Sequence, residues 1–142
     1  MGYIQRITLA CNVTVSGGGA QSFRTSNLPN GGYLEAITYT KALTSGFSTA
    51  GHVQVLCDQS SQIMLNVTTT GTSGVAVSYY PRAAAQDSSG VIYGPATGAG
   101  AVVGFPTRYP IGQEAIRIVA SSGGTASNGG VGFTMNFYVS GV

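Results

Sequence analysis

The strongest constraint in this sequence is that apolar side chains recur at every second position. Residues 7–15 carry apolar side chains at the odd positions, and residues 131–139 repeat this pattern. In the second segment the apolar residues are Val131, Phe133, Met135, Phe137 and Val139. A period of two is typical of β-strands with one buried face, whereas an amphipathic helix has a period of 3.6. Both segments are therefore predicted to be long strands.

Shorter alternating segments fill the middle of the chain. Residues 53–57 and 63–67 alternate on either side of Gln59-Ser60-Ser61, which predicts a hairpin. The turn-forming residues 71–74 precede a third segment at 75–79, so we expect a three-strand meander. Further strands are expected at residues 33–42, 91–93, 101–105 and 115–120. No segment predicts a helix.

About eight or nine short strands separated by Gly, Pro, Asn and Ser favour an antiparallel β-sandwich or jelly roll. A small barrel is the main rival. No long linker or fixed-period repeat divides the sequence, so we expect a single β domain over residues 1–142. Two Gly/Ser-rich stretches, residues 16–31 and 121–130, are predicted to be flexible loops.

Charged side chains are scarce, at 7% of residues with a formal net charge of +2. An average soluble domain has about 25%. So little charge disfavours nucleic acid or an anionic membrane as a partner, and it also disfavours coiled coils and helical bundles. The long uncharged stretches are interrupted by Gly, Pro and polar residues, and residues 1–6 do not match a secretory signal. We therefore expect a protein made in the cytoplasm, without a membrane-spanning segment.

The residues that could carry chemistry are few. His52 is the single histidine, and Asp58 lies six positions further along the same predicted strand, or roughly 20 Å at about 3.3 Å per residue. That separation excludes a direct His–Asp relay. The other carboxylates, Glu35, Asp87 and Glu114, are too scattered to predict a glycosidase pair, and Glu114 is expected to pair with a basic residue. We therefore predict no catalytic, cofactor or metal site, and no enzymatic activity.

Cys11 and Cys57 both fall on apolar strand faces. Two cysteines with one histidine do not make a zinc site. For a protein made in the cytoplasm, two buried free thiols are favoured over a disulfide.

The tyrosines are the most informative polar side chains. In the segment 33–42, Tyr33, Ile37 and Tyr39 are expected to share one face. Half-buried tyrosines at sheet edges are common, and this is the first interpretation. The alternative is a contact surface, because Tyr and Arg anchor protein interfaces and also line sugar sites. The candidate interface residues are Tyr80, Arg82, Tyr93 and Tyr109.

Three segments and a closing strand resemble small head-associated proteins of tailed bacteriophages, of the capsid decoration or cement type. They are residues 32–41 (GYLEAITYTK), 80–83 (YPRA), 111–121 (IGQEAIRIVAS) and the closing strand that contains Gly132-Phe133. The resemblance covers residues 32–142 in order, while residues 11–31 resemble nothing in that family. It implies a β-rich fold without catalytic residues and a structural role on the virion, often as a homo-oligomer.

From this resemblance we expect a non-enzymatic virion protein that decorates or cements the capsid, and the composition is compatible with that role. Its partners would be the major capsid protein and further copies of itself. Few Lys or Pro residues guard the predicted strands, so self-association through a sandwich face or edge is expected. The alternative is a glycan- or host-binding β-sandwich module of a tail or fibre.

Overall fold

The computed structural model describes residues 3–14, 19–41, 51–68, 75–84, 89, 106–121 and 131–141. This part of the chain is all-β, as predicted, and it has no helix that could cross a membrane. The strands are β1 (Ile4–Val13), β2 (Ala20–Arg24), β3 (Gly32–Lys41), β4 (His52–Cys57), β5 (Ile63–Thr68), β6 (Ala76–Tyr79), β7 (Ala83–Ala84), β8 (Pro106–Thr107), β9 (Tyr109–Ile111), β10 (Ile116–Ser121) and β11 (Val131–Ser140).

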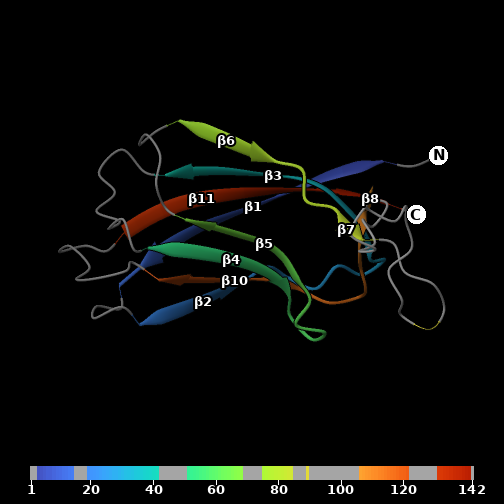
Figure 1. Cartoon of the computed structure of the whole chain (residues 1–142), viewed down its shortest axis with the longest axis horizontal. Helices are drawn as coiled ribbons and strands as arrows, with labels where there is room; N and C mark the ends of the chain where they lie inside the picture. The colour runs from blue at the N-terminus through green and yellow to red at the C-terminus, as the bar shows by residue number, and fades with distance from the viewer. Residues whose placement is uncertain are drawn as a thin grey trace, which may run out of the picture.

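The longer strands pair from the two ends of the chain inward. β1 pairs with β11, β2 with β10, β3 with β6, and β4 with β5, all antiparallel. The lateral pairs β11–β3 and β10–β4 join these ribbons into two sheets, β1-β11-β3-β6 and β2-β10-β4-β5. This nested order is that of a jelly roll, and Figure 1 shows the two sheets stacked as layers. The sandwich prediction is confirmed, and among the described strands the barrel is wrong.

The core lies between the two sheets. The largest fully buried side chains come from both inner faces: Leu34, Ile37, Met135 and Phe137 from the first sheet, and Val53, Val55, Ile116 and Ile118 from the second. Phe133 on β11 meets Phe23 on β2 edge to face, with ring centroids 6.3 Å apart. Burying one such side chain stabilises the fold by roughly 1.5–3 kcal/mol. The alternation in the sequence therefore identifies the faces that pack together.

The predicted meander is wrong at its third strand. β4 and β5 form the expected hairpin, but β6 pairs with β3 in the other sheet. The alternation of residues 75–79 identifies a strand, yet it carries no information about which strand lies beside it. In the nested order of a jelly roll, β5 ends in the second sheet and β6 lies in the first, so the chain crosses between the sheets after β5.

The predicted loop over residues 16–31 is also wrong in part, because it contains β2. Phe23 is the one large apolar residue of that strand, so the alternation was too weak to predict it. Beyond β2, the Leu28 amide donates to the Glu114 carbonyl at 3.1 Å, and the Leu28 side chain is buried. The predicted strands at 91–93 and 101–105, and the predicted loop 121–130 beyond Ser121, lie outside the described residues.

A β-bulge interrupts the pairing of β3 with β11 at Glu35. Leu34 is paired with Val139 and Ala36 with Tyr138, which leaves Glu35 without a partner in the register. Buried positions on β3 are therefore even-numbered before the bulge and odd-numbered after it. Because the alternation changes phase, Tyr33 does not share a face with Ile37 and Tyr39, contrary to the sequence prediction.

The entry into β3 requires glycine. Gly31 and Gly32 have φ angles of +62° and +144°, a region that side chains with a Cβ rarely adopt. A Cβ at Gly32 would also collide with the carbonyl oxygen of Ser140. Glycine at this position lets the end of β11 lie close against β3, which places Ser140 beside the bulge.

The hydroxyl of Tyr39 is buried and has no hydrogen-bond partner in the described structure, and burial raises its pKa to about 12. Tyr39→Phe removes this unsatisfied hydroxyl and keeps the ring beside Phe133, 5.6 Å between centroids. We expect this variant to gain about 1 kcal/mol in free energy of unfolding, measured by urea denaturation. Tyr39→Leu, which also loses the ring contact, should be less stable than Tyr39→Phe. A clear loss of stability in Tyr39→Phe would contradict this prediction.

Candidate interaction surface

The bulge turns Glu35 into the centre of a polar cluster. Its Oε1 accepts hydrogen bonds from Ser140 Oγ at 2.6 Å and from Arg108 Nη1 at 2.8 Å. Ser140 first, and then the hydrogen bond and charge of Arg108, hold the pKa of Glu35 below its ordinary value of 4.5. Glu35 is therefore a carboxylate near neutral pH and anchors groups from β11 and from the segment before β9.

Two arginine side chains are held at this cluster by different contacts. The guanidinium of Arg108 lies 4.5 Å from the centroid of the Tyr33 ring, a cation–π contact. Arg82 Nη1 donates to the carbonyl oxygens of Glu35, at 3.1 Å, and of Pro81, at 2.8 Å. Among the described residues, Arg82 has no carboxylate within ion-pair distance. The cluster therefore carries two positive charges against one negative charge.

Tyr80, which is 68% exposed, extends this cluster, because it follows Tyr79, the partner of Ile37 on β3, and lies two residues before Arg82. We call the five residues Tyr33, Glu35, Tyr80, Arg82 and Arg108 the Glu35 surface. The structure thus brings two of the predicted interface residues, Tyr80 and Arg82, to one place.

The other two predicted interface residues do not belong to this surface. Tyr109 is half-buried and packs on the core from β9, while Tyr93 lies outside the described residues. Sequence reasoning missed Tyr33, Glu35 and Arg108. The neighbouring pair Arg108-Tyr109 was a weak sequence signal, but the bulge that brings Glu35 to Arg108 cannot be seen in an alternation pattern.

Glu114 does not pair with a basic side chain in the described structure, so that prediction is wrong. Its Oε2 accepts hydrogen bonds from the backbone amides of Gln59, at 2.6 Å, and Ser60, at 3.1 Å, and its Oε1 accepts from Ser60 Oγ at 3.2 Å. Burial raises the pKa of Glu114, but these hydrogen bonds lower it by more, so the pKa lies below its ordinary value of 4.5. Glu114 therefore fastens the turn between β4 and β5.

Asp58 and its two arginine partners also have a structural role. Asp58 Oδ1 lies 3.5 Å from Arg24 Nη2 and 3.6 Å from Arg117 Nε, which links three elements of the second sheet. His52 begins β4 and is exposed, while Asp58 follows the other end of that strand. The two residues lie at opposite ends of β4, in agreement with the distance expected from the sequence.

Both cysteines are buried and free, as predicted, and they belong to different sheets. Desolvation raises the pKa of Cys11 to about 12 and also raises the pKa of Cys57. Both thiols are therefore protonated near neutral pH and are poor nucleophiles. Among the described residues, no three His, Cys, Asp or Glu side chains are grouped to hold a metal ion.

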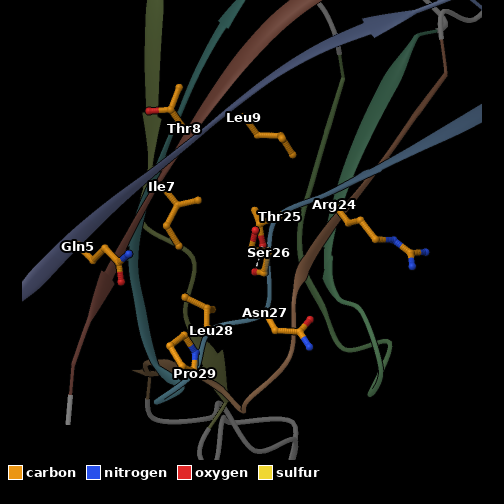
Figure 2. A pocket seen from close by; sticks show the side chains of 10 residues that line it. All are labelled: Gln5, Ile7, Thr8, Leu9, Arg24, Thr25, Ser26, Asn27, Leu28 and Pro29. Carbon is orange, nitrogen blue, oxygen red and sulfur yellow. Dashed lines mark hydrogen bonds between the residues drawn. The ribbon is translucent and has the colours of Figure 1, made fainter.

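A groove of about 330 Å³ opens between the edge strands of the two sheets (Figure 2). Its apolar lining consists of Ile7 and Leu9 on β1 and of Leu28 and Pro29 beyond β2, and none of the described lining residues is aromatic. The polar lining residues are Gln5, Thr8, Arg24, Thr25, Ser26 and Asn27. The groove is large enough for a few side chains of a partner.

No protein-family model and no curated protein matches the sequence. Among solved structures, the chain is similar to dimeric latent PorU from Porphyromonas gingivalis, with a TM-score of 0.39 and 8% sequence identity. The match covers 97% of this chain but only 13% of the PorU chain. A likeness at this level supports neither a shared fold nor a shared function.

Glu114→Gln replaces a carboxylate that holds two backbone amides and a hydroxyl. We expect the free energy of unfolding at neutral pH to fall by about 1–3 kcal/mol, measured by urea denaturation. Because the pKa of Glu114 is lowered on folding, its contribution is complete above pH 4.5 and is lost as the pH falls through the lower folded-state pKa. The difference between the variant and the original protein should therefore shrink in acid.

Gln59→Ala is the matched control, because Gln59 donates through its backbone amide, which this change retains. It should leave both the stability and its pH dependence close to those of the original protein. An equal loss in the two variants would show that Glu114 does not fasten the turn.

Proposed function

We propose that this protein is a non-enzymatic structural protein of a tailed-bacteriophage virion that decorates or cements the capsid by binding the assembled shell. The Glu35 surface carries the proposal. Tyr80 is 68% exposed, and Arg82 offers a positive charge without a carboxylate partner in the described structure. Tyrosine and arginine are the side chains that most often anchor protein interfaces.

The two arginines of this surface are already held in place. Arg108 is fixed between the Tyr33 ring and the Glu35 carboxylate, and Arg82 is fixed by two backbone carbonyls. Immobilising a long side chain on binding costs roughly 0.5–1.5 kcal/mol, and a side chain that is already ordered loses less. This arrangement suits a surface whose role is to bind rather than to react.

The fold is compatible with this role, and the sequence resemblance favours it. Jelly rolls occur in viral capsid domains and also in lectins, so the fold alone does not choose between them. The segments that resemble head-associated proteins include residues 32–41 and 80–83, which contribute four of the five residues of the Glu35 surface. The capsid would be stabilised by mass action, since the protein would bind the assembled shell and not its free subunits.

The alternative, a glycan- or host-binding module of a tail or fibre, has less support. Sugar sites usually offer an aromatic ring for stacking, and the described residues that line the groove offer none. Tyr80 is exposed and lies two residues before Arg82 in the chain, and exposed Tyr and Arg are enriched in protein interfaces.

The proposal is tested with phage heads that lack this protein. Purified protein is mixed with the heads, and the number of copies that sediment with them is measured by gel densitometry. We expect near-stoichiometric binding, with affinity reduced about tenfold by Arg82→Ala and by Tyr80→Ala, because both remove anchoring contacts. These variants should keep the melting temperature of the original protein.

Ile63→Ala is the matched control, since this side chain is exposed on the second sheet. This variant should bind heads like the original protein. Absence of binding to heads, together with binding to a glycan array, would overturn the capsid proposal in favour of the alternative.

A further inference from the structure

β1 is a long strand at the edge of the first sheet as the described strands form it. It pairs with β11 along all ten residues, and no described strand pairs with its other side. At about 3.4 Å per residue it presents roughly 34 Å of backbone to a partner. Its one charged residue is Arg6, and it contains no proline, so it lacks most of the features that normally protect an edge strand.

The inner face of this edge is incompletely covered. Ile7 and Leu9 point toward the core but remain partly exposed, whereas Cys11 and Val13 on the same face are buried. Figure 2 shows the side chains of Ile7 and Leu9 projecting toward the groove beneath β1. Around Ile7 and Leu9, the described part of the chain therefore provides neither a strand beside the outer side of β1 nor a complete apolar cover.

We infer that a second copy of this chain supplies both, with the two β1 strands paired antiparallel about a two-fold axis perpendicular to the first sheet. Such an axis keeps the inward-facing side chains of the two copies on the same side of the joined sheet. With the axis at Thr8, Ile7 of one copy lies opposite Leu9 of the second copy. Ile7 and Leu9 of each copy then cover Leu9 and Ile7 of the other copy at its groove.

Charge and polarity favour a second copy as the occupant. In this register Arg6 lies opposite Ala10 of the second copy, so the two like charges do not face each other. Arg24, the one charged residue that lines the groove, is already 3.5 Å from Asp58. The remaining lining residues are aliphatic or neutral and polar, as is most of β1 itself. The groove and the strand that fills it are therefore chemically alike.

The other exposed edge of the first sheet is less suited to this pairing. β6 has four residues, and its pairing with a second copy would form a much shorter ladder than the ten residues of β1. β6 nevertheless exposes Val77, at 39%, which makes it a suitable control edge.

This dimer does not depend on the capsid proposal. β11 separates β1 from β3, which carries Tyr33 and Glu35, so β1 pairing leaves the Glu35 surface free on each copy. Two such surfaces on one dimer would raise its avidity for a repeated lattice. Dimerisation and binding to heads can therefore fail separately, and each is measured by its own experiment.

Sedimentation velocity of the full chain tests the inference. We expect a dimer of twice the 14.4 kDa chain mass that dissociates on dilution. Leu9→Lys should raise the dimer dissociation constant about tenfold or more, because it places a charge on the apolar seam of each copy. Val77→Lys, the same change at a partly exposed position on β6, should leave the dimer intact. A monomer at all concentrations, or equal effects of the two variants, would overturn the inference.

A cross-link tests the register without disturbing the core. Thr8 borders the groove but is exposed, and its side chain points to the side of β1 opposite to Ile7 (Figure 2); the two-fold axis places it opposite Thr8 of the second copy. Thr8→Cys should therefore form a disulfide-linked dimer on mild oxidation. Ser78→Cys, exposed on β6, should stay monomeric on a non-reducing gel. If Ser78→Cys cross-linked and Thr8→Cys did not, the dimer would form through β6 instead of β1, and the proposed pairing would be overturned.

Discussion

Burial of two facing apolar sheet surfaces is the interaction on which the rest of this structure depends. With 7% charged residues, the chain has few ion pairs to use, and exposed pairs contribute only about 0–1 kcal/mol each. The inner faces meet at Phe133, which contacts Phe23 of the opposite sheet and Tyr39 of its own sheet. Packing therefore sets the spacing of the layers, and the polar features are built on their rims.

The bulge at Glu35 shows how a small irregularity in this packing creates a surface. Leu34 and Ile37 are both fully buried although their positions differ in parity, so one extra residue must be accommodated between them. The extra residue is Glu35, and it binds Ser140 and Arg108. A bulge re-aims the side chains around it, and here it gathers groups from β3, β11 and the segment before β9.

The described carboxylates all serve as anchors. Glu35 holds Arg108 and Ser140, Asp58 lies between Arg24 and Arg117, and Glu114 fastens the turn between β4 and β5. This use of the acids supports the proposed binding role over a catalytic one. The scarcity of charge also leaves β1 nearly neutral along its length, and a neutral edge can approach another copy without strong repulsion.

The sequence by itself determined the all-β class, the presence of the long strands β1 and β11 although not the bounds of β1, the hairpin of β4 and β5, and the buried state of both cysteines. These features depend on which side chains alternate, and alternation is local. Only the tertiary structure decided that β6 joins β3, that residues 20–24 form a strand, and that Glu35 meets Arg108 across 73 positions of the chain. Strand partners and bulges are set by how the two sheets pack, and a pattern of period two contains neither.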